Sequence, residues 1–256
     1  MLLAQLSDIH AAPDNDNLSR LACALTWLDT LQPDVLVLTG DLVDDGWLAG
    51  YQAIAKLLDS KPWPVFILPG NADCHEMMRA VWNNQPWSDT GAMHFVKEIS
   101  GMRLIGLDTT VNGAAAGSVL EHLSWLEKHL AADTTLPAIL FLHHHIFKSG
   151  IPALDNIMCS GHRELERLLK NAPRPLVAIT GGHVHRPMMS NVAGIPAFIC
   201  GSICPANPLW LGGESVPPVY DPPSLMIHRF TDGTLVSHHV SVSASTVPDE
   251  YITTLK

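Results

Sequence analysis

Short apolar segments alternate with amphipathic segments along the first two-thirds of the chain. Continuous apolar runs predict five strands, at Leu2–Leu6, Val35–Leu38, Val65–Leu68, Ile139–Leu142 and Leu176–Ile179. Apolar residues at helical spacing predict helices at Leu18–Leu31, Leu48–Leu58, Glu76–Val81, Leu120–Leu130 and His162–Leu169. Strands that are apolar on both faces and separated by helices are typical of α/β proteins, because such strands are buried on both sides.

The remaining strands follow a different pattern. Phe95–Leu107 predicts a hairpin of two strands, and Ala197–Cys200 predicts a single strand. Ser224–Phe230 and Leu235–Val240 predict a second hairpin, because the turn sequence Thr231-Asp232-Gly233 joins them. Hairpins combined with strand–helix units indicate mixed sheets. We therefore expect an α/β fold, a mixed β-sheet sandwich flanked by helices.

The organisation of the chain predicts a single domain over residues 1–256. No Ser/Gly-rich or charged linker divides it, and 47% hydrophobic against 16% charged residues excludes a disordered chain. Pro205–Pro223 holds six prolines and predicts a long irregular loop. No apolar run approaches the roughly 20 residues that cross a bilayer, so no membrane segment is expected.

The N-terminal sequence and the cysteines favour the cytoplasm. The segment MLLAQLSDIH has no basic region before its apolar residues, and it predicts a strand rather than a signal peptide. Five cysteines form an odd set without paired spacing, which fits a reducing compartment.

The charge of the chain narrows its partners. Asp and Glu number 25 against 15 Lys and Arg, a net charge of -10, whereas proteins that bind polymeric nucleic acid are normally basic. An acidic chain still accepts a small anionic substrate when metal ions supply positive charge locally. We therefore expect a small-molecule partner rather than a nucleic-acid polymer or a membrane.

Potential metal ligands follow the apolar runs. The chain has 14 histidines, and seven Asp, His or Asn residues lie just after strand ends: Asp8, His10, Asp41, Asn71, His143, His183 and His185. The carboxyl ends of strands in an open α/β sheet line one crevice, so these side chains are expected to converge. Their oxygen and nitrogen donors suit Zn, Mn, Fe or Co. With one bridging carboxylate, seven ligands serve two divalent ions with four ligands each.

Each motif also has an ordinary structural explanation. Asp8 and Asp41 occupy positions typical of turns, and Asn71 follows a glycine, where asparagine often adopts a left-handed conformation. Histidines such as those at 143–145 also occur in cores and on surfaces. The metal-centre hypothesis therefore depends on the agreement of all five strand ends.

This order of motifs resembles the calcineurin-like metallophosphoesterase superfamily, and within it the class III cyclic nucleotide phosphodiesterases and the bacterial glycerophosphodiesterase. The likeness covers most of residues 1–230, and its motifs are Asp8-x-His10, Gly40-Asp41, Gly70-Asn71, His143-His144 and Gly182-His183-Val184-His185. The resemblance implies two ligand sets joined by a bridging Asp41: Asp8, His10 and His185 for the first ion, and Asn71, His143 and His183 for the second.

One departure from the family pattern concerns the proton donor. The family has Gly-Asn-His-Asp/Glu where this chain has Gly70-Asn71-Ala72-Asp73, so the histidine that the family assigns to leaving-group protonation or transition-state stabilisation is absent. Asp73 and Glu76 predict a capping box for the following helix. His75, in the first turn of that helix, is either a replacement acid or an exposed helix residue.

A second departure is the histidine run. The family's His-His-Pro is His143-His144-His145 here, and we take His143 as the ligand because it directly follows the apolar strand. His144 and His145 are either polar loop residues or groups that support the ligands or contact substrate. The expected catalytic residues are Asp41, Asn71, His75 and His144.

These features together predict a metal-dependent phosphodiesterase. Two ions neutralise the phosphate and activate a hydroxide that attacks it, and the resemblance favours glycerophosphodiesters or cyclic nucleotides as substrates. The alternatives are a phosphomonoesterase of the same fold and a weakened enzyme that acts as a binding or scaffold protein. A single-metal β-lactam or thioester hydrolase lacks its His-x-His-x-Asp-His motif, because Arg186-Pro187 follows His185. Family members commonly form homo-oligomers, which makes Pro205–Pro223 a candidate subunit contact or pocket rim.

Overall fold

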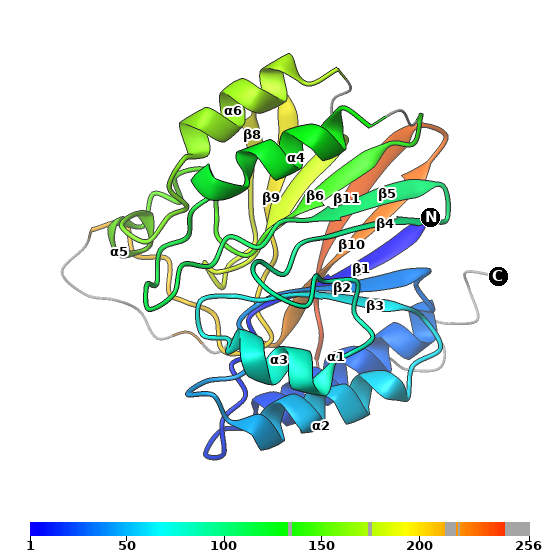
Figure 1. Cartoon of the computed structure of the whole chain (residues 1–256). Coiled ribbons are helices and arrows are strands. Elements are labelled where there is room, and N and C mark those ends of the chain that lie inside the picture. The colour runs from blue at the N-terminus through cyan, green and yellow to red at the C-terminus, as the bar shows by residue number, and fades with distance from the viewer. Residues whose placement is uncertain (133–134, 174–175, 213–218, 220, 244–256) are drawn as a thin grey trace.

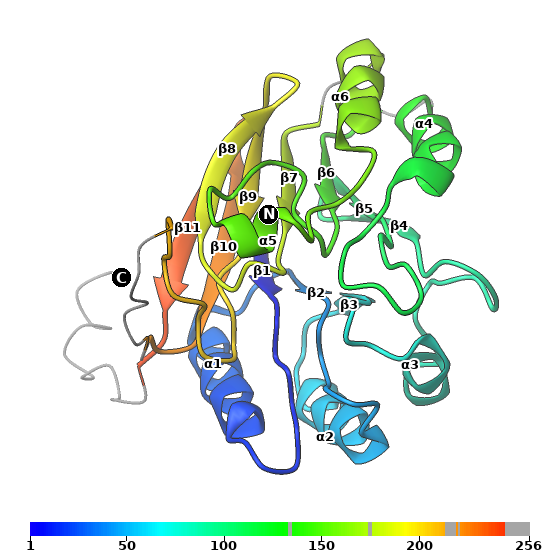
Figure 2. The same cartoon turned by 90° about the vertical axis from the view of Figure 1, so that its left-hand side faces the viewer.

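The chain folds into two facing β-sheets with helices on the outer side of each sheet (Figure 1). The computed structural model describes residues 1–132, 135–173, 176–212, 219 and 221–243. The view turned by 90° shows the same layers, helix, sheet, sheet and helix (Figure 2). The expected mixed sandwich flanked by helices is therefore confirmed. Within the described residues, no helix has both the length and the hydropathy to cross a membrane.

The first sheet joins three N-terminal strands to a C-terminal hairpin. Its strands are β1 (Leu2–Leu6), β2 (Val35–Thr39), β3 (Val65–Leu68), β10 (Ser224–Thr231) and β11 (Thr234–Ser241). Their order is β11-β10-β1-β2-β3. β1, β2 and β3 run parallel, whereas β10 is antiparallel to β1 and to β11. The carboxyl ends of β1, β2 and β3 therefore meet at one edge of this sheet.

The second sheet has a parallel centre and an antiparallel hairpin at each side. Its strands are β4 (Phe95–Ile99), β5 (Met102–Gly106), β6 (Ala138–Phe141), β7 (Ala178–Gly181), β8 (Met188–Val192) and β9 (Ile195–Ile199). Their order is β4-β5-β6-β7-β9-β8, with β5, β6, β7 and β9 parallel. The ends of β6 and β7 face the same edge of the molecule as the ends of β1 to β3 (Figure 2).

The helices bury the outer faces of the sheets. The first sheet is covered by α1 (Asn17–Leu31), α2 (Leu48–Asp59) and α3 (His75–Val81), and the second by α4 (Leu123–Leu130) and α6 (His162–Asn171) (Figure 1). Strand β2 shows why its sequence is apolar throughout. Leu36 and Leu38 pack in the core under the helices, whereas Val35 and Val37 pack in the core between the sheets. Both faces of the strand are thus buried.

The elements differ from the predicted ones in three places. The expected helix Leu120–Leu130 begins as a 3₁₀ turn, η1 (Leu120–His122), and becomes α4 only at Leu123. Strand β8 and the short helix α5 (Pro152–Asp155) were not predicted. Of the expected loop Pro205–Pro223, the described residues form no helix or strand, and the rest lies outside the described residues.

A buried polar seam joins the two sheets close to the strand ends. The amide of Gln5 on β1 donates to Thr39 Oγ1 on β2 (3.0 Å) and to the Gly181 carbonyl on β7 (3.1 Å). Its oxygen accepts from Thr180 Oγ1 (2.6 Å) and from His228 Nε2 (3.1 Å). All the hydrogen-bonding capacity of this buried amide is therefore used, and that holds the ends of β1 and β7 together.

Candidate metal centre

Five of the seven predicted ligands adopt a left-handed backbone conformation. Asp8, His10, Asp41, His183 and His185 have φ values of 54°, 48°, 54°, 71° and 57°. Such values are uncommon for residues with a Cβ and cost on the order of 1–3 kcal/mol each, and they cluster at functional sites. The chain therefore turns sharply after three strands in order to present these side chains.

The turns after β2 and β3 also approach each other closely. Gly40 has a φ of +90°, and a Cβ there would lie 2.5 Å from the Gly70 nitrogen. A Cβ at Gly70 would lie 2.3 Å from Asp41 Oδ1. Only glycine leaves the room that brings Asp41 and Asn71 together.

The first cluster comprises Asp8, His10, Asp41 and His185, with ligand atoms that lie within 4.8 Å of one another. His10 Nε2 lies 3.3 Å from Asp41 Oδ2 and 3.1 Å from His185 Nε2. His185 Nε2 lies 3.3 Å from Asp8 Oδ1. These four side chains come from the ends of β1, β2 and β7.

The second cluster gathers around His143. His143 Nε2 lies 3.3 Å from Asp41 Oδ2, 3.2 Å from Asn71 Oδ1 and 3.2 Å from His183 Nδ1. Asp41 Oδ2 is therefore equally distant from a histidine nitrogen of each cluster. The structure brings all seven predicted ligands together, with Asp41 between the two groups.

Two histidines of the clusters donate a hydrogen bond through Nδ1, the nitrogen that faces away from the cluster. In the neutral ring, Nε2, the inner nitrogen that faces the cluster, then carries a lone pair. His10 Nδ1 donates to Asp44 Oδ1 (2.6 Å), and His143 Nδ1 donates to the Thr39 carbonyl (2.7 Å). Each inner Nε2 is then an acceptor that faces carboxylate or amide oxygens, which are acceptors too. Acceptors that meet without a donor repel one another unless a cation or a proton lies between them. The donor set therefore fits divalent metal ions.

The pKa values of the cluster reflect the same repulsion between acceptors. Burial lowers the pKa of His143, but the charge of Asp41 and the hydrogen bond to it raise the pKa more, to about 9. Burial raises the pKa of Asp41, but the charge of His143 and the hydrogen bonds of His10 and His143 bring it well below its usual value. In the metal-free chain, protons would take the place that a cation fills.

Two residues that support the ligands were not predicted. The Asp44 carboxylate orients His10, and Cys204 Sγ lies 3.3 Å from His185 Nδ1. In the sequence, the only indication of the role of Asp44 is that an acidic residue lies three positions after Asp41. Cys204 follows β9 in a loop, and the sequence gave no indication of its role. The described cysteines carry no disulfide.

The predicted capping box of Asp73 and Glu76 is wrong. Helix α3 begins after Cys74 without a side-chain cap. The Asp73 carboxylate instead accepts hydrogen bonds from Tyr51 Oη (2.9 Å) and from backbone amides, those of Leu42 (3.0 Å), Val43 (3.3 Å) and Gly70 (2.9 Å). These amides belong to the loops after β2 and β3, so Asp73 fixes the two turns that carry Asp41 and Asn71.

The histidines after β6 lie inside the protein beside the second cluster. His144 Nδ1 forms a hydrogen bond with Thr109 Oγ1 (2.8 Å), and its Nε2 is buried without a partner among the described residues. The His144 ring lies 4.7 Å from that of His183. Both ring nitrogens of His145 are likewise buried and unpartnered there, and burial lowers the pKa of His145 to about 4. Neither residue is exposed.

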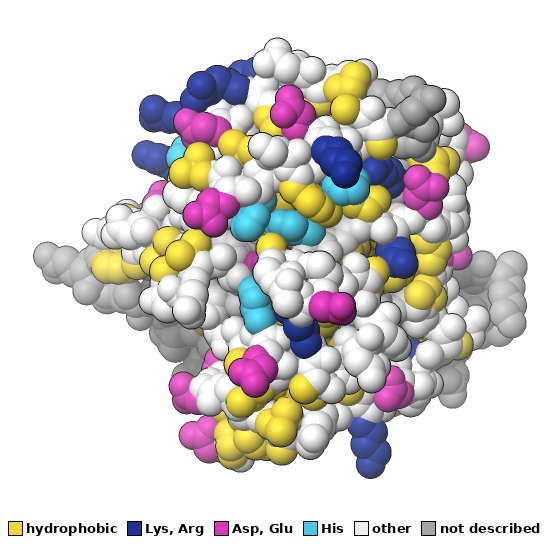
Figure 3. Space-filling model, in the orientation of Figure 1, with side chains coloured by type: hydrophobic (Ala, Val, Ile, Leu, Met, Phe, Trp, Pro, Cys, Tyr) yellow, Lys and Arg dark blue, Asp and Glu magenta, His cyan; other side chains and the backbone are white. Residues whose placement is uncertain are grey.

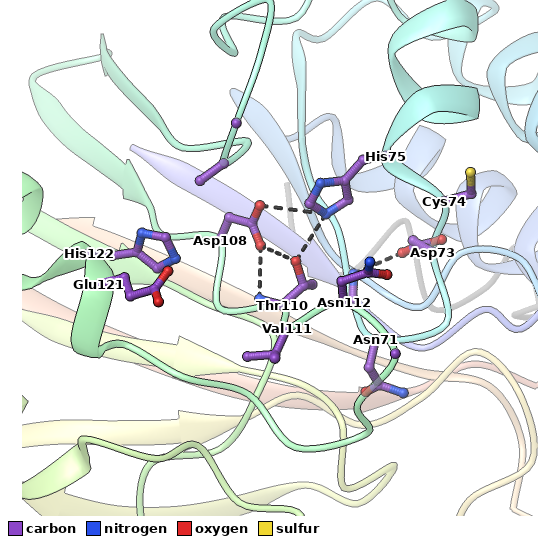
Figure 4. A pocket seen from close by; sticks show the side chains of 14 residues that line it. Asn71, Asp73, Cys74, His75, Asp108, Thr110, Val111, Asn112, Glu121 and His122 are labelled. Carbon is purple, nitrogen blue, oxygen red and sulfur yellow. Dashed lines mark hydrogen bonds and ion pairs between the residues drawn. The ribbon is translucent and has the colours of Figure 1, made fainter.

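A cavity of about 490 Å³ opens beside the second cluster. Asn71 lines it at one end, and the other lining residues include His75, Asp108, Thr110, Glu121 and His122 (Figure 4). His75 is half-buried, and its ring is turned towards Asp108 and Thr110 rather than towards solvent. In the orientation of Figure 1, histidine side chains reach the surface near the middle of the visible face (Figure 3).

The two-sheet fold and the cluster at the strand ends define the class of metal-dependent phosphoesterases. The family model of the calcineurin-like phosphoesterases matches residues 1–187, and the chain belongs to this family.

Relatives with phosphodiesterase names and a solved phosphatase structure agree with this family. The glycerophosphodiester phosphodiesterase GpdQ of Enterobacter lignolyticus is 29% identical over an alignment of length 276, which covers 98% of this chain and 96% of that protein. The 3′,5′-cyclic adenosine monophosphate phosphodiesterase CpdA of Haemophilus influenzae is 30% identical over 173 residues, 67% of this chain and 61% of that protein. A dimetal phosphatase from Danio rerio has the same fold, with a TM-score of 0.74 at 11% identity. The match covers 95% of this chain and 99% of that one.

Proposed function

We propose that this chain is a metal-dependent phosphodiesterase that hydrolyses small-molecule phosphodiesters, with glycerophosphodiesters and cyclic nucleotides as the leading substrates. The observation that carries the proposal is the position of Asp41 Oδ2, 3.3 Å from His10 Nε2 and 3.3 Å from His143 Nε2. One carboxylate oxygen shared by two clusters of acceptors is the arrangement that a pair of divalent cations requires. The names of the relatives, GpdQ and CpdA, support the substrate class.

The proposed ligands are those of the two clusters: Asp8, His10 and His185 for one ion, Asn71, His143 and His183 for the other, and Asp41 for both. The nitrogen and oxygen donors suit Mn, Fe, Zn or Co. Bound divalent ions supply positive charge to the phosphate and lower the pKa of a water molecule. Asn71 is a neutral ligand, so it leaves the positive charge of the ions available to the substrate.

The cavity beside Asn71 is proposed to hold one of the two alcohol groups of the diester. Asn71 belongs to the second cluster and also lines the cavity, so a substrate bound at the cluster extends into it. Of the described lining residues, none is a lysine or an arginine. Arg186, the nearest cation in sequence to the ligands, donates to the Asn207 carbonyl (2.6 Å). The site therefore favours a diester monoanion over a monoester dianion.

His75 is the proposed proton donor to the departing alkoxide. Ala72 offers only a methyl group where the family has a histidine, and His75 lines the same cavity as Asn71. Burial lowers the pKa of His75, and the charge of Asp108 opposes that shift. His144, with its unpartnered Nε2 beside His183, is proposed to contact the ligands or the substrate from the other side.

The experiment is a rate panel on one sample whose metal content is measured. The substrates are a methyl aryl phosphodiester, the matching aryl monoester, glycerophosphodiesters and cyclic nucleotides. We expect a higher kcat/KM for the diesters than for the monoester. A higher kcat/KM for the aryl monoester than for its methyl diester would instead support the phosphomonoesterase alternative. A protein that binds two ions and hydrolyses neither would support the scaffold alternative.

A further inference from the structure

One edge of the His75 ring is held by two residues of the loop that follows β5. His75 Nε2 lies 3.0 Å from Thr110 Oγ1 and 3.6 Å from Asp108 Oδ2 (Figure 4). His75 stands at the start of α3, which packs on the first sheet, whereas Asp108 and Thr110 extend from the second sheet. The contact therefore joins the two halves of the sandwich across the cavity.

The hydroxyl of Thr110 determines which nitrogen of His75 carries a proton. A hydroxyl has one hydrogen, and Thr110 Oγ1 donates it to Asp108 Oδ1 at 2.7 Å. A short bond to a carboxylate is stronger than a bond to a neutral ring nitrogen. Thr110 Oγ1 is then an acceptor towards His75, so the hydrogen bond of 3.0 Å requires a proton on Nε2.

Asp108 itself is rigidly held. Its carboxylate is buried and accepts hydrogen bonds from the backbone amides of Met93 (2.8 Å) and Thr110 (2.9 Å). Its own backbone amide donates to His94 Nδ1 (2.9 Å). Asp108 thus has a fixed orientation and presents negative charge to the Nε2 edge of His75, as the buried carboxylate of a catalytic triad does to its histidine.

We propose that Thr110 and Asp108 are positioning residues that hold His75 with its proton on Nε2, and that Nδ1 is the atom that exchanges a proton with the substrate. The inference rests on the proposed function, in which His75 is the acid. Nδ1 has no hydrogen-bond partner in the part of the chain that the structure describes. Nε2–H stays bonded to Thr110 in both charge states of the ring, so only the Nδ1 proton is free to leave.

The proton that leaves His75 replaces the bond that the alcohol oxygen loses to phosphorus. As hydroxide oxygen bonds to phosphorus, the bond from phosphorus to the alcohol oxygen breaks, and its electron pair goes to that oxygen. The oxygen takes the proton from Nδ1 of the imidazolium, which leaves a neutral His75 with its proton on Nε2. Solvent then returns a proton to Nδ1. The Asp108 carboxylate stabilises the imidazolium electrostatically and does not change its own protonation.

The direct test is the tautomer of His75, measured by two-bond ¹H–¹⁵N correlation spectra of histidine-labelled full-length protein with Zn²⁺ bound. His75→Ala assigns the signal. We expect the parent to show a single neutral tautomer, protonated on Nε2. Thr110→Val, which has a similar shape and no hydroxyl, should give a mixture of tautomers, and Thr110→Ser should restore the single one. Thr30→Val, on the exposed face of α1, is the matched control.

The kinetic test uses a diester with a basic alkoxide leaving group and one with a nitrophenolate. We expect Thr110→Val to lower kcat for the first about tenfold, a part of the 10²–10⁴-fold that general acid catalysis contributes, with KM unchanged. The nitrophenolate leaves without a proton, so the loss of kcat with that diester should be much smaller than with the alkoxide diester, and Thr110→Ser should recover kcat with both.

Two results would overturn the positioning role: a parent His75 protonated on Nδ1, or a tautomer that Thr110→Val leaves unchanged. The parent spectrum decides the first point even if a variant fails to fold. A failure of the proposed function is distinct. A tautomer that responds as expected, in a protein whose His75→Ala variant keeps the parent's leaving-group dependence, supports the positioning and contradicts His75 as the acid.

Discussion

The metal cluster and the cavity beside it share Asn71 but are built on opposite principles. In the cluster, acceptors meet acceptors: His143 Nε2 faces Asp41 Oδ2 and Asn71 Oδ1 at 3.3 and 3.2 Å. In the cavity, donors meet acceptors, and the chain from His75 through Thr110 to Asp108 is closed by hydrogen bonds. The acceptors of the cluster need a cation between them, whereas the hydrogen bonds among His75, Thr110 and Asp108 pair each donor with an acceptor.

In the proposed function, the cluster binds the phosphate and the cavity binds and protonates the alcohol. The cluster gathers the seven proposed ligands, five of which have a left-handed backbone conformation. The chain has Ala72 where the family pattern has a histidine, and the cavity is lined by the hydrogen-bonded residues His75, Thr110 and Asp108.

Asp41→Asn should change the metal cluster more than any other single substitution. The substitution removes the charge that both clusters share, so we expect metal affinity to fall at both sites and turnover to fall by orders of magnitude. Elemental analysis and the rate with a methyl aryl diester measure the two effects. Asp45→Asn is the control, because Asp45 is exposed and is not one of the ligands. An Asp41→Asn protein with full metal content and full rate would refute the shared role.

Ala72→His and His75→Ala test the cavity. Across diesters of graded leaving-group pKa, His75→Ala should steepen the dependence of kcat, with a loss of about 10²–10⁴-fold for basic alkoxides and little loss for nitrophenolates. Ala72→His restores the family histidine and should flatten the dependence. An unchanged slope in His75→Ala would show that the proton comes from elsewhere, with His144 as the next residue to test.

Asp44→Asn should weaken metal binding and leave the cavity unchanged. Asp44 holds His10 through a bond of 2.6 Å to Nδ1, and the loss of such a partner typically costs about 10–100-fold in metal affinity. Competition with a chelating indicator measures the affinity, again with Asp45→Asn as control. The cavity should be unaffected, so the leaving-group dependence should stay that of the parent. A changed dependence would show that the two regions are coupled.

The smallest expected effect concerns the seam that joins the sheets. Burial lowers the pKa of His228 to about 4, below the ordinary value of 6.5. On acidification the unfolded chain binds a proton first, so this stabilisation is present above pH 6.5 and is lost as the pH falls towards 4. We expect His228 to account for about 2 kcal/mol of the stability lost between pH 7 and pH 5.

Urea unfolding of the parent and of His228→Gln at both pH values measures this contribution. The glutamine retains a donor for Gln5, and we expect its free energy of unfolding to fall less on acidification than that of the parent. Equal losses in the two proteins would show that burial does not lower the pKa of His228.

The cluster could be predicted from the sequence because parallel strands bring their carboxyl ends to one edge. That geometry is a property of the fold class, so Asp8, Asp41 and His143 were assigned without knowing the contacts. Asp73 was misassigned because its partners are backbone amides of two different loops, which no local pattern reveals. Cys204 and Thr110 were missed for the same reason, since each acts on a residue far away in the chain.

The fold was predicted best where burial dominates. The strands of the central layers are apolar on both faces and were found, whereas β8 was missed because three of its five residues are exposed. The family and the sandwich are confirmed. The expectations of a single domain, a cytoplasmic location and a homo-oligomer, and the identity of the two metals, stay predictions.

The proposed mechanism requires two ions that act together on one phosphodiester. It is tested most directly by titration of metal-free protein with Mn²⁺ or Zn²⁺, while metal binding and the rate with a methyl aryl diester are followed on the same sample. We expect the rate to reach its maximum at two ions per chain. A maximum at one bound ion per chain, with no gain from a second, would contradict it.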